Sequence, residues 1–98
     1  MNLKEEYDLE YLVNESEKLV IEELEKQLSE DWAADICRCQ DCILDMAALA
    51  LNSMKPLYRV SLMGNVYAPA LDSQERENAR SAVNRAIKKI SVNPSHGK

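Results

Sequence analysis

The sequence predicts an all-α fold, a small helical homodimer built around a buried central helix. Its 98 residues make up one domain, and 2 Gly and 3 Pro are too few for a turn-rich β fold. Two stretches repeat apolar residues at the spacing of one helix face. A third stretch is apolar almost all round a helix, and a chain this short can hardly bury such a helix alone.

The first helix is predicted to begin at Asn14 and to end at Leu28. Asn14 can cap it, and Glu17 three residues later completes the pattern of a capping box. An apolar residue then recurs every four positions from Val20 onward, which gives the helix one buried face. Residues 7–13 are expected to form a preceding turn of helix.

The central helix is predicted over residues 43–54. Nine of these twelve residues are apolar, and Asp45 and Asn52 leave only one narrow polar face. Such a helix is buried on most sides, and dimerisation through it is the simplest way to cover it. The alternative is a central helix wrapped by the other two helices of the same chain.

The segment after Pro56 is extended in character, with a turn signal at residues 63–65, so we expect a short β hairpin or an extended loop. The last helix is predicted to open at Asp72 and to run to Ile90. Acidic residues come early in it and basic residues late, which suits the helix dipole. The tail over residues 92–98 is expected to fray.

The net charge of −5 is unevenly distributed. Residues 1–54 carry 4 basic and 14 acidic side chains, a net of −10, whereas residues 55–98 carry 8 basic and 3 acidic side chains, a net of +5. An acidic chain is a poor general binder of nucleic acids, because that binding depends on many phosphate contacts. Either the basic half holds one small anion, or the two halves neutralise each other across the fold or a dimer.

No apolar run reaches the ~18 residues of a membrane-spanning helix. Residues 1–6 also lack the basic-then-apolar order of a signal peptide. We therefore expect a cytoplasmic protein with no membrane partner, whose cysteines are reduced.

All three cysteines fall within six residues, at Cys37, Cys39 and Cys42. An odd number of thiols so close together does not suit a disulfide framework. Cys42 falls in the first turn of the central helix, where the helix N-terminus favours a thiolate. Three thiolates suit Zn²⁺ in a structural site, which takes four ligands. The fourth ligand stays open among Asp35, Asp41, His96, a group of a partner chain and water. The alternatives to zinc are inert or redox-active thiols and an incomplete iron–sulfur site.

A second candidate site would bind an anion. Arg76 and Arg80 lie one helical turn apart, and Tyr58 and Arg59 form a further basic and aromatic cluster. Arginine forks suit phosphate and a tyrosine ring suits stacking, so these four residues are candidates for a phosphate-and-base ligand. The alternative is a solvated helix face on which Arg76 pairs with Asp72 and Arg80 with Glu77.

Signatures of an enzyme are missing from the sequence. It has no glycine-rich phosphate loop and no glycine-flanked nucleophile, and its one histidine lies in the tail. We therefore expect a protein without catalytic residues.

Residues 14–60 carry three motifs in order, namely a capped helix start with spaced acidic and apolar residues, the cysteine triplet, and a small-residue helix followed by Pro-x-Tyr. The residues are Asn14, Glu17, Leu19, Val20, Glu22 and Leu24, then Cys37, Cys39 and Cys42, then Asp45, Ala47, Ala50, Leu51, Asn52, Pro56 and Tyr58. This order resembles the late competence development protein ComFB family. The chain departs from the usual Pro-Pro before the tyrosine, since it has Lys55-Pro56 there.

The resemblance implies a small α-helical homodimer in the bacterial cytoplasm, with zinc held by the cysteine triplet. It also implies a receptor for a cyclic dinucleotide, cyclic di-GMP or cyclic di-AMP, linked to competence or surface behaviour and acting on a regulatory protein that is still to be named. The alternative function is a purely structural zinc-stapled protein–protein interaction module with no nucleotide ligand.

Overall fold

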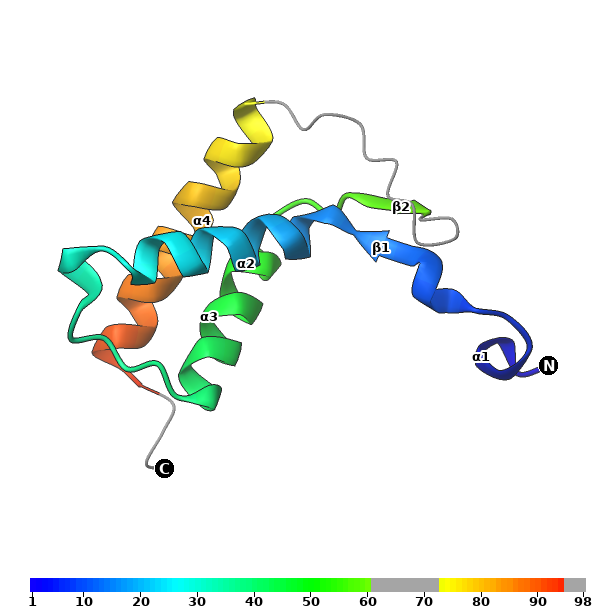
Figure 1. Cartoon of the computed structure of the whole chain (residues 1–98), viewed down its shortest axis with the longest axis horizontal. Coiled ribbons are helices and arrows are strands. Elements are labelled where there is room, and N and C mark those ends of the chain that lie inside the picture. The colour runs from blue at the N-terminus through cyan, green and yellow to red at the C-terminus, as the bar shows by residue number, and fades with distance from the viewer. Residues whose placement is uncertain (61–72, 95–98) are drawn as a thin grey trace.

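The computed structural model describes residues 1–60 and 73–94 and confirms the mainly helical class. Its helices are α1 (Leu3–Glu6), α2 (Glu15–Leu28), α3 (Gln40–Asn52) and α4 (Ser73–Val92), and its two strands are β1 (Leu12–Asn14) and β2 (Tyr58–Val60). Short 3₁₀ turns cover Leu9–Tyr11 and Asp31–Ala33. Figure 1 shows α2, α3 and α4 gathered into one body, with α1 far from it at the N-terminal end. Residues 1–12 are exposed throughout.

Asn14 caps α2 as predicted, and it also ties the start of that helix to a distant segment. Its Oδ1 accepts hydrogen bonds from the backbone N–H of Ser16 at 3.1 Å and of Leu57 at 2.8 Å. The bond to Ser16 falls one residue short of the Glu17 position that a capping box would use. A single amide side chain therefore sets both the start of α2 and the path of the chain after α3.

The two strands pair with each other in an antiparallel ladder, with Leu12 opposite Val60 and Asn14 opposite Tyr58. The prediction of a helical turn over residues 7–13 was therefore wrong from Leu12 onward, because that backbone bonds to β2. The expected strand after Pro56 exists, but it pairs across the fold with β1. The second half of the expected hairpin, residues 61–72, lies outside the described residues.

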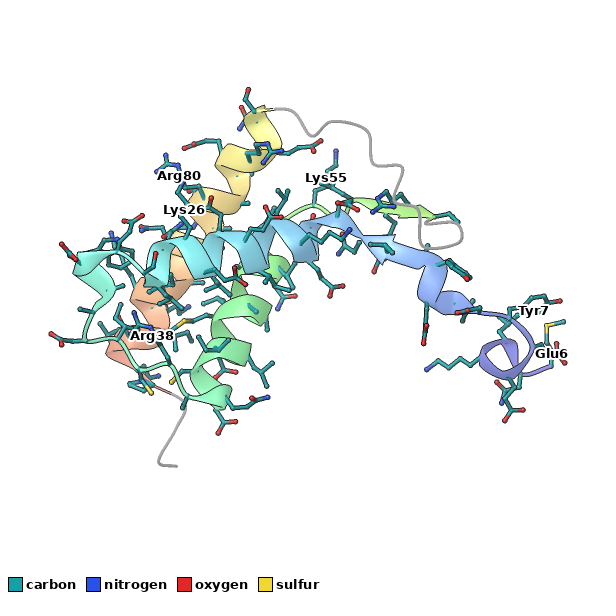
Figure 2. All side chains as sticks on the ribbon, viewed as in Figure 1. Glu6, Tyr7, Lys26, Arg38, Lys55 and Arg80 are labelled. Carbon is teal, nitrogen blue, oxygen red and sulfur yellow. The ribbon has the colours of Figure 1, made fainter. Side chains whose placement is uncertain are left out.

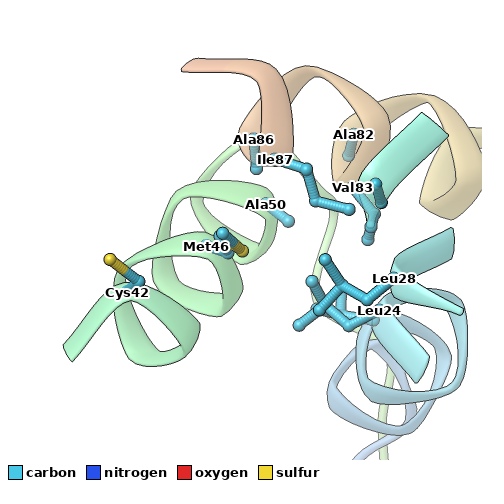
Figure 3. Close-up of a cluster of buried hydrophobic side chains, with 11 residues drawn as sticks. Leu24, Leu28, Cys42, Met46, Ala50, Ala82, Val83, Ala86 and Ile87 are labelled. Carbon is cyan, nitrogen blue, oxygen red and sulfur yellow. The ribbon is translucent and has the colours of Figure 1, made fainter. Parts of the chain in front are cut away.

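The core lies where the three long helices meet (Figure 3). Val20 of α2, Met46 of α3, and Val83 and Ile87 of α4 are fully buried there. Burying side chains of this size contributes about 1.5–3 kcal/mol each, which makes this cluster the main source of stability. Gln27 adds a polar link, since its Nε2 donates to the Arg80 carbonyl at 3.0 Å.

The central helix α3 is fully buried along one side. Its buried residues are Cys42, Met46 and Ala50, each one turn from the next. On the opposite side Leu44 is 55% exposed, and Ala48 is exposed as well. Most other apolar residues of α3 pack against the core, as the alternative of a central helix wrapped by the other two expects, so the single chain leaves Leu44 and Ala48 as the exposed apolar residues of this helix.

The last helix runs from Ser73 to Val92, two residues beyond its predicted end at Ile90. Its predicted cap, Asp72, and residues 95–98 of the predicted tail lie outside the described residues. None of the helices in the described part of the chain is long and apolar enough to cross a membrane.

Candidate metal centre and anion-binding residues

The three cysteine sulfurs converge at the start of α3. Their Sγ atoms all lie within 4.8 Å of one another, with Cys42 buried and Cys37 and Cys39 half-buried. Three sulfurs bound to one zinc at about 2.3 Å would lie about 3.8 Å apart in a tetrahedral site. The observed arrangement is thus close to the geometry that a metal ion needs, and small side-chain movements would complete it.

Local structure explains why the sulfurs meet. Cys39 is the N-cap of α3, and its Sγ accepts a hydrogen bond from the Cys42 backbone N–H at 3.4 Å. This contact brings two of the thiols together and starts the helix at Gln40, three residues before the predicted start at Ile43. Cys42 therefore lies in the first turn of α3, as the sequence predicted.

The neighbouring groups affect the protonation of Cys37. A hydrogen bond with the Cys39 backbone lowers the pKa of the Cys37 thiol, but burial and the side chains of Cys39 and Cys42 outweigh it and raise the pKa overall. Without a cation, the Cys37 thiol is therefore harder to deprotonate than an ordinary cysteine. A bound Zn²⁺ would supply the positive charge that stabilises three thiolates.

The fourth ligand is not identified in the described part of the chain. The group of donor atoms that converges there consists of the three cysteines, and Asp35 and Asp41 are outside it and exposed. His96 lies beyond the described residues. A group of a partner chain or a water molecule could also supply the fourth ligand.

Arg59 is held by an acidic partner. Its guanidinium pairs with the Glu15 carboxylate at the start of α2, and the side chains are only 11% and 10% exposed. Its Nη1 is buried without a hydrogen-bond acceptor among residues 1–60 and 73–94. The neighbouring Tyr58 points its side chain outward and is 63% exposed.

Arg76 and Arg80 lie together on α4, as their spacing predicts. They line a pocket of about 270 Å³ between α4 and α2, to which α2 contributes Glu22, Glu23 and Lys26. Figure 2 shows Arg80 and Lys26 next to each other at this crossing. Tyr58 and Arg59 do not line that pocket, so a single chain does not join the four candidate residues into one site.

Arg80 also has a partner within its own helix. Its Nε donates to Glu77 at 2.9 Å, which is the pairing that the solvated-face alternative expects. The hydrogen bond with Arg80 lowers the pKa of the Glu77 carboxyl, and the same contact raises the pKa of Arg80. Both side chains are more than half exposed, so this pair contributes little to stability.

A second polar pocket was not predicted. It has a volume of about 380 Å³ and lies between the end of α3 and α4, with Lys55 and Arg85 as its cations and Asn78 and Ser81 as neutral polar groups. The signal that could have revealed it is the polar stripe at residues 74, 78, 81 and 85, which share one face of a helix.

Comparison with known proteins gives the family. The family model described as late competence development protein ComFB matches residues 13–94. The chain belongs to the ComFB family. The matched region begins next to α2, so α1 and the turn Leu9–Tyr11 precede it.

A solved structure of a ComFB family member supports the same conclusion. The late competence protein ComFB from Bacillus subtilis is 27% identical, with a TM-score of 0.67 over 87% of this chain and 96% of that chain. No curated protein matches the sequence. The family match over residues 13–94 covers α2, α3 and α4 and the three cysteines between Cys37 and Cys42.

Proposed function

We propose that this ComFB family protein is a non-enzymatic regulatory module, a homodimer that holds one structural zinc per chain and binds a cyclic dinucleotide. The observation that carries the proposal is the convergence of three thiols at the N-terminus of α3. Within the bacterial cytoplasm these thiols stay reduced and available to a metal. The proposal assigns no catalytic residue, and binding is the whole of the activity.

Zinc fits the donor set and the position of the site. Sulfur donors select soft or borderline ions over Mg²⁺ and Ca²⁺, and zinc is the common occupant of cysteine-rich structural sites. The loop before α3 has few buried side chains of its own, whereas Cys42 belongs to the core cluster. A metal at this point would fix that loop to the core, so its binding free energy would add to folding free energy.

A homodimer would cover the outer side of α3. Leu44 and Ala48 are exposed there, and Ala47 and Leu51 beside them are half-buried and also pack against the core cluster. These four residues, named here the α3 outer face, follow the spacing of one helix side and form an apolar stripe. Exposed apolar surface of this kind marks an interaction site, and a two-fold axis beside α3 would place two such faces against each other.

The cyclic dinucleotide is the finer part of the proposal. Its support is the presence of two polar pockets with paired cations, Arg76 and Arg80 in one and Lys55 and Arg85 in the other. The larger pocket, at about 380 Å³, falls within the range of small-molecule sites, and a dimer would bring two copies of it. A regulatory protein would then respond to the ligand-bound dimer.

A specific observation favours the alternative, an interaction module with no nucleotide ligand. Arg59 and Arg80 both have carboxylate partners within the chain, which reduces the positive charge they offer to a phosphate. A thermal-shift screen with cyclic di-GMP and cyclic di-AMP separates the two functions. A ligand at 100 times its Kd stabilises the folded state by about 2.7 kcal/mol, whereas the interaction module would show no shift with either nucleotide.

A further inference from the structure

Arg38 lies between Cys37 and Cys39 in the sequence. Its side chain extends back across the turn that joins α2 to α3 (Figure 2). Its Nη1 donates to the Ile36 carbonyl at 2.9 Å, and its Nη2 donates to the Ala33 carbonyl at 3.1 Å and to the Leu28 carbonyl. One side chain thereby fixes three points of the backbone that precedes the cysteines.

Each of these bonds satisfies a backbone carbonyl of the loop or of the end of α2. Leu28 is the last residue of α2, where carbonyl groups have no partner within the helix and the dipole favours a cation. A guanidinium offers five donors in a rigid plane, so it can bind several carbonyls at once, and bonds from a charged donor are the stronger kind. Arg38 is the one basic residue of residues 29–54, a stretch that also holds Glu30, Asp31, Asp35, Asp41 and Asp45.

Apart from these bonds, the loop is held by the buried Ala33 and by local backbone hydrogen bonds such as that from the Ile36 N–H to the Ala33 carbonyl at 3.1 Å. Between α2 and α3 the chain has one short 3₁₀ turn, Asp31–Ala33, and Cys37 and Cys39 are only half-buried. A metal that had to order a free loop would lose affinity to the entropy of ordering it. A loop that is already fixed presents its sulfurs at a lower entropic cost.

We propose that Arg38 is the positioning residue of the metal centre, which fixes the cysteine loop to the end of α2 so that the three thiols converge before a metal binds. This inference rests on the proposed metal site. Arg38 is not a ligand, and it acts through the backbone of the ligand-bearing loop.

The same bonds connect the metal centre to Trp32. Arg38 holds the carbonyl of Ala33, and Trp32 precedes Ala33 in the turn Asp31–Ala33. The indole Nε1 donates to Glu30 at 2.7 Å, and Lys88 Nζ lies 5.9 Å from the ring centroid. Trp32 is the only tryptophan of the chain, so its fluorescence reports on this turn alone.

The test uses the full-length protein and the variant Arg38→Lys, which keeps the charge and the aliphatic stem but lacks the planar fork. Zinc affinity is measured by competition with a chromophoric chelator, and the geometry by the absorption spectrum of the cobalt-substituted protein. Removing a group that orients metal ligands typically lowers affinity 10–100-fold, and we expect Arg38→Lys to do so. The absorption bands of its cobalt-substituted form should lose intensity, and the change in Trp32 fluorescence on metal binding should be smaller than in the wild type.

Lys89→Ala is the matched control, because it removes a positive charge from an exposed position of α4. This variant should keep the wild-type affinity and spectrum. Circular dichroism shows whether Arg38→Lys keeps its helices. Arg38→Gln also removes the charge and is too short to reach all three carbonyls, so it should bind zinc no more tightly than Arg38→Lys.

Wild-type affinity and an unchanged cobalt spectrum in Arg38→Lys would overturn the inference while leaving the metal site intact. A wild-type protein that binds neither zinc nor cobalt would instead defeat the proposed metal site, and the role of Arg38 with it.

Discussion

Cys39 Sγ accepts a hydrogen bond from the Cys42 backbone N–H at 3.4 Å, so one candidate metal ligand caps the helix that carries another. The start of α3 and the geometry of the cysteine cluster are therefore one structural feature. A metal bound at Cys39 would draw on the same sulfur that now satisfies an amide of the first turn. Metal occupancy and the stability of the α3 N-terminus should thus be coupled.

Replacing Cys39 with Ser separates these two roles. Serine is a good N-cap, so Cys39→Ser should keep the start of α3 while it removes one sulfur from the metal centre. We expect lower zinc content by elemental analysis and a lower thermal midpoint than in the wild type. In the presence of a strong chelator the difference in midpoint should nearly vanish, and a Cys39→Ser protein with full zinc content would contradict the assignment.

The ion pair between Arg59 and Glu15 predicts that removing Arg59 lowers the stability of the protein, an effect that the sequence alone did not predict. Both side chains are about nine-tenths buried, and removing one partner of such a pair leaves the other charge uncompensated. Arg59→Ala should lower the free energy of unfolding of the ligand-free protein by about 3 kcal/mol, measured by urea denaturation. In a double-mutant cycle with Glu15→Gln the two losses should not add.

Arg80→Ala is the matched control for that measurement. Its partner Glu77 is exposed, so breaking this pair should leave the urea midpoint almost unchanged. An equal loss in Arg59→Ala and Arg80→Ala would contradict the structural role of the Arg59–Glu15 pair.

The α3 outer face predicts which substitutions break the homodimer without damaging the core. Leu49 is half-buried and packs against the core cluster, so a charge there would also unfold a single chain. Leu44 is 55% exposed in the single chain, and Leu44→Glu should be tolerated in a monomer but not between two apolar faces.

We therefore expect Leu44→Glu to run as a folded monomer in light scattering at tens of micromolar, while the wild type runs as a dimer. Ile21→Glu on α2, where the side chain is similarly exposed, should remain dimeric. A wild-type monomer, or an Ile21→Glu monomer with a dimeric Leu44→Glu, would reject this face as the interface.

The two polar pockets predict how nucleotide binding responds to charge removal. Arg76→Ala, Arg80→Ala, Lys55→Ala and Arg85→Ala each remove one cation, and a charge-assisted hydrogen bond is worth about 1.5–3 kcal/mol. Calorimetric titration with cyclic di-GMP and cyclic di-AMP should show which pair of variants loses affinity, and added salt should weaken binding in the wild type. Unchanged affinity in all four variants would remove both pockets from the nucleotide site.

The helices were predictable from local pattern, and the contacts between distant segments were not. The four-residue repeat from Val20 to Leu28 predicts α2 because helix periodicity is a local property. The cysteine spacing likewise predicts the convergence of the three sulfurs, since all three cysteines fall within six residues. The β1–β2 ladder consists of three residues on each side, and so short a segment carries no clear alternation.

The hydrogen bonds of Arg38 and Arg59 illustrate the contacts that the sequence does not predict. The sequence shows that both are basic residues in or near an extended segment, and it favours a solvent or ligand role for Arg59. Their partners, Leu28 and Glu15, become neighbours only after α2 and α3 have packed. Tertiary contacts of this kind decide whether a cation is available to a ligand or already used by the fold.

The central claim, a homodimer with one zinc per chain, is tested most directly by native mass spectrometry of protein purified without chelator. We expect the mass of two chains plus two zinc ions, which should shift to apo protein and lose stability when a strong chelator is added. A metal-free monomer that keeps its full thermal stability in chelator would contradict the claim.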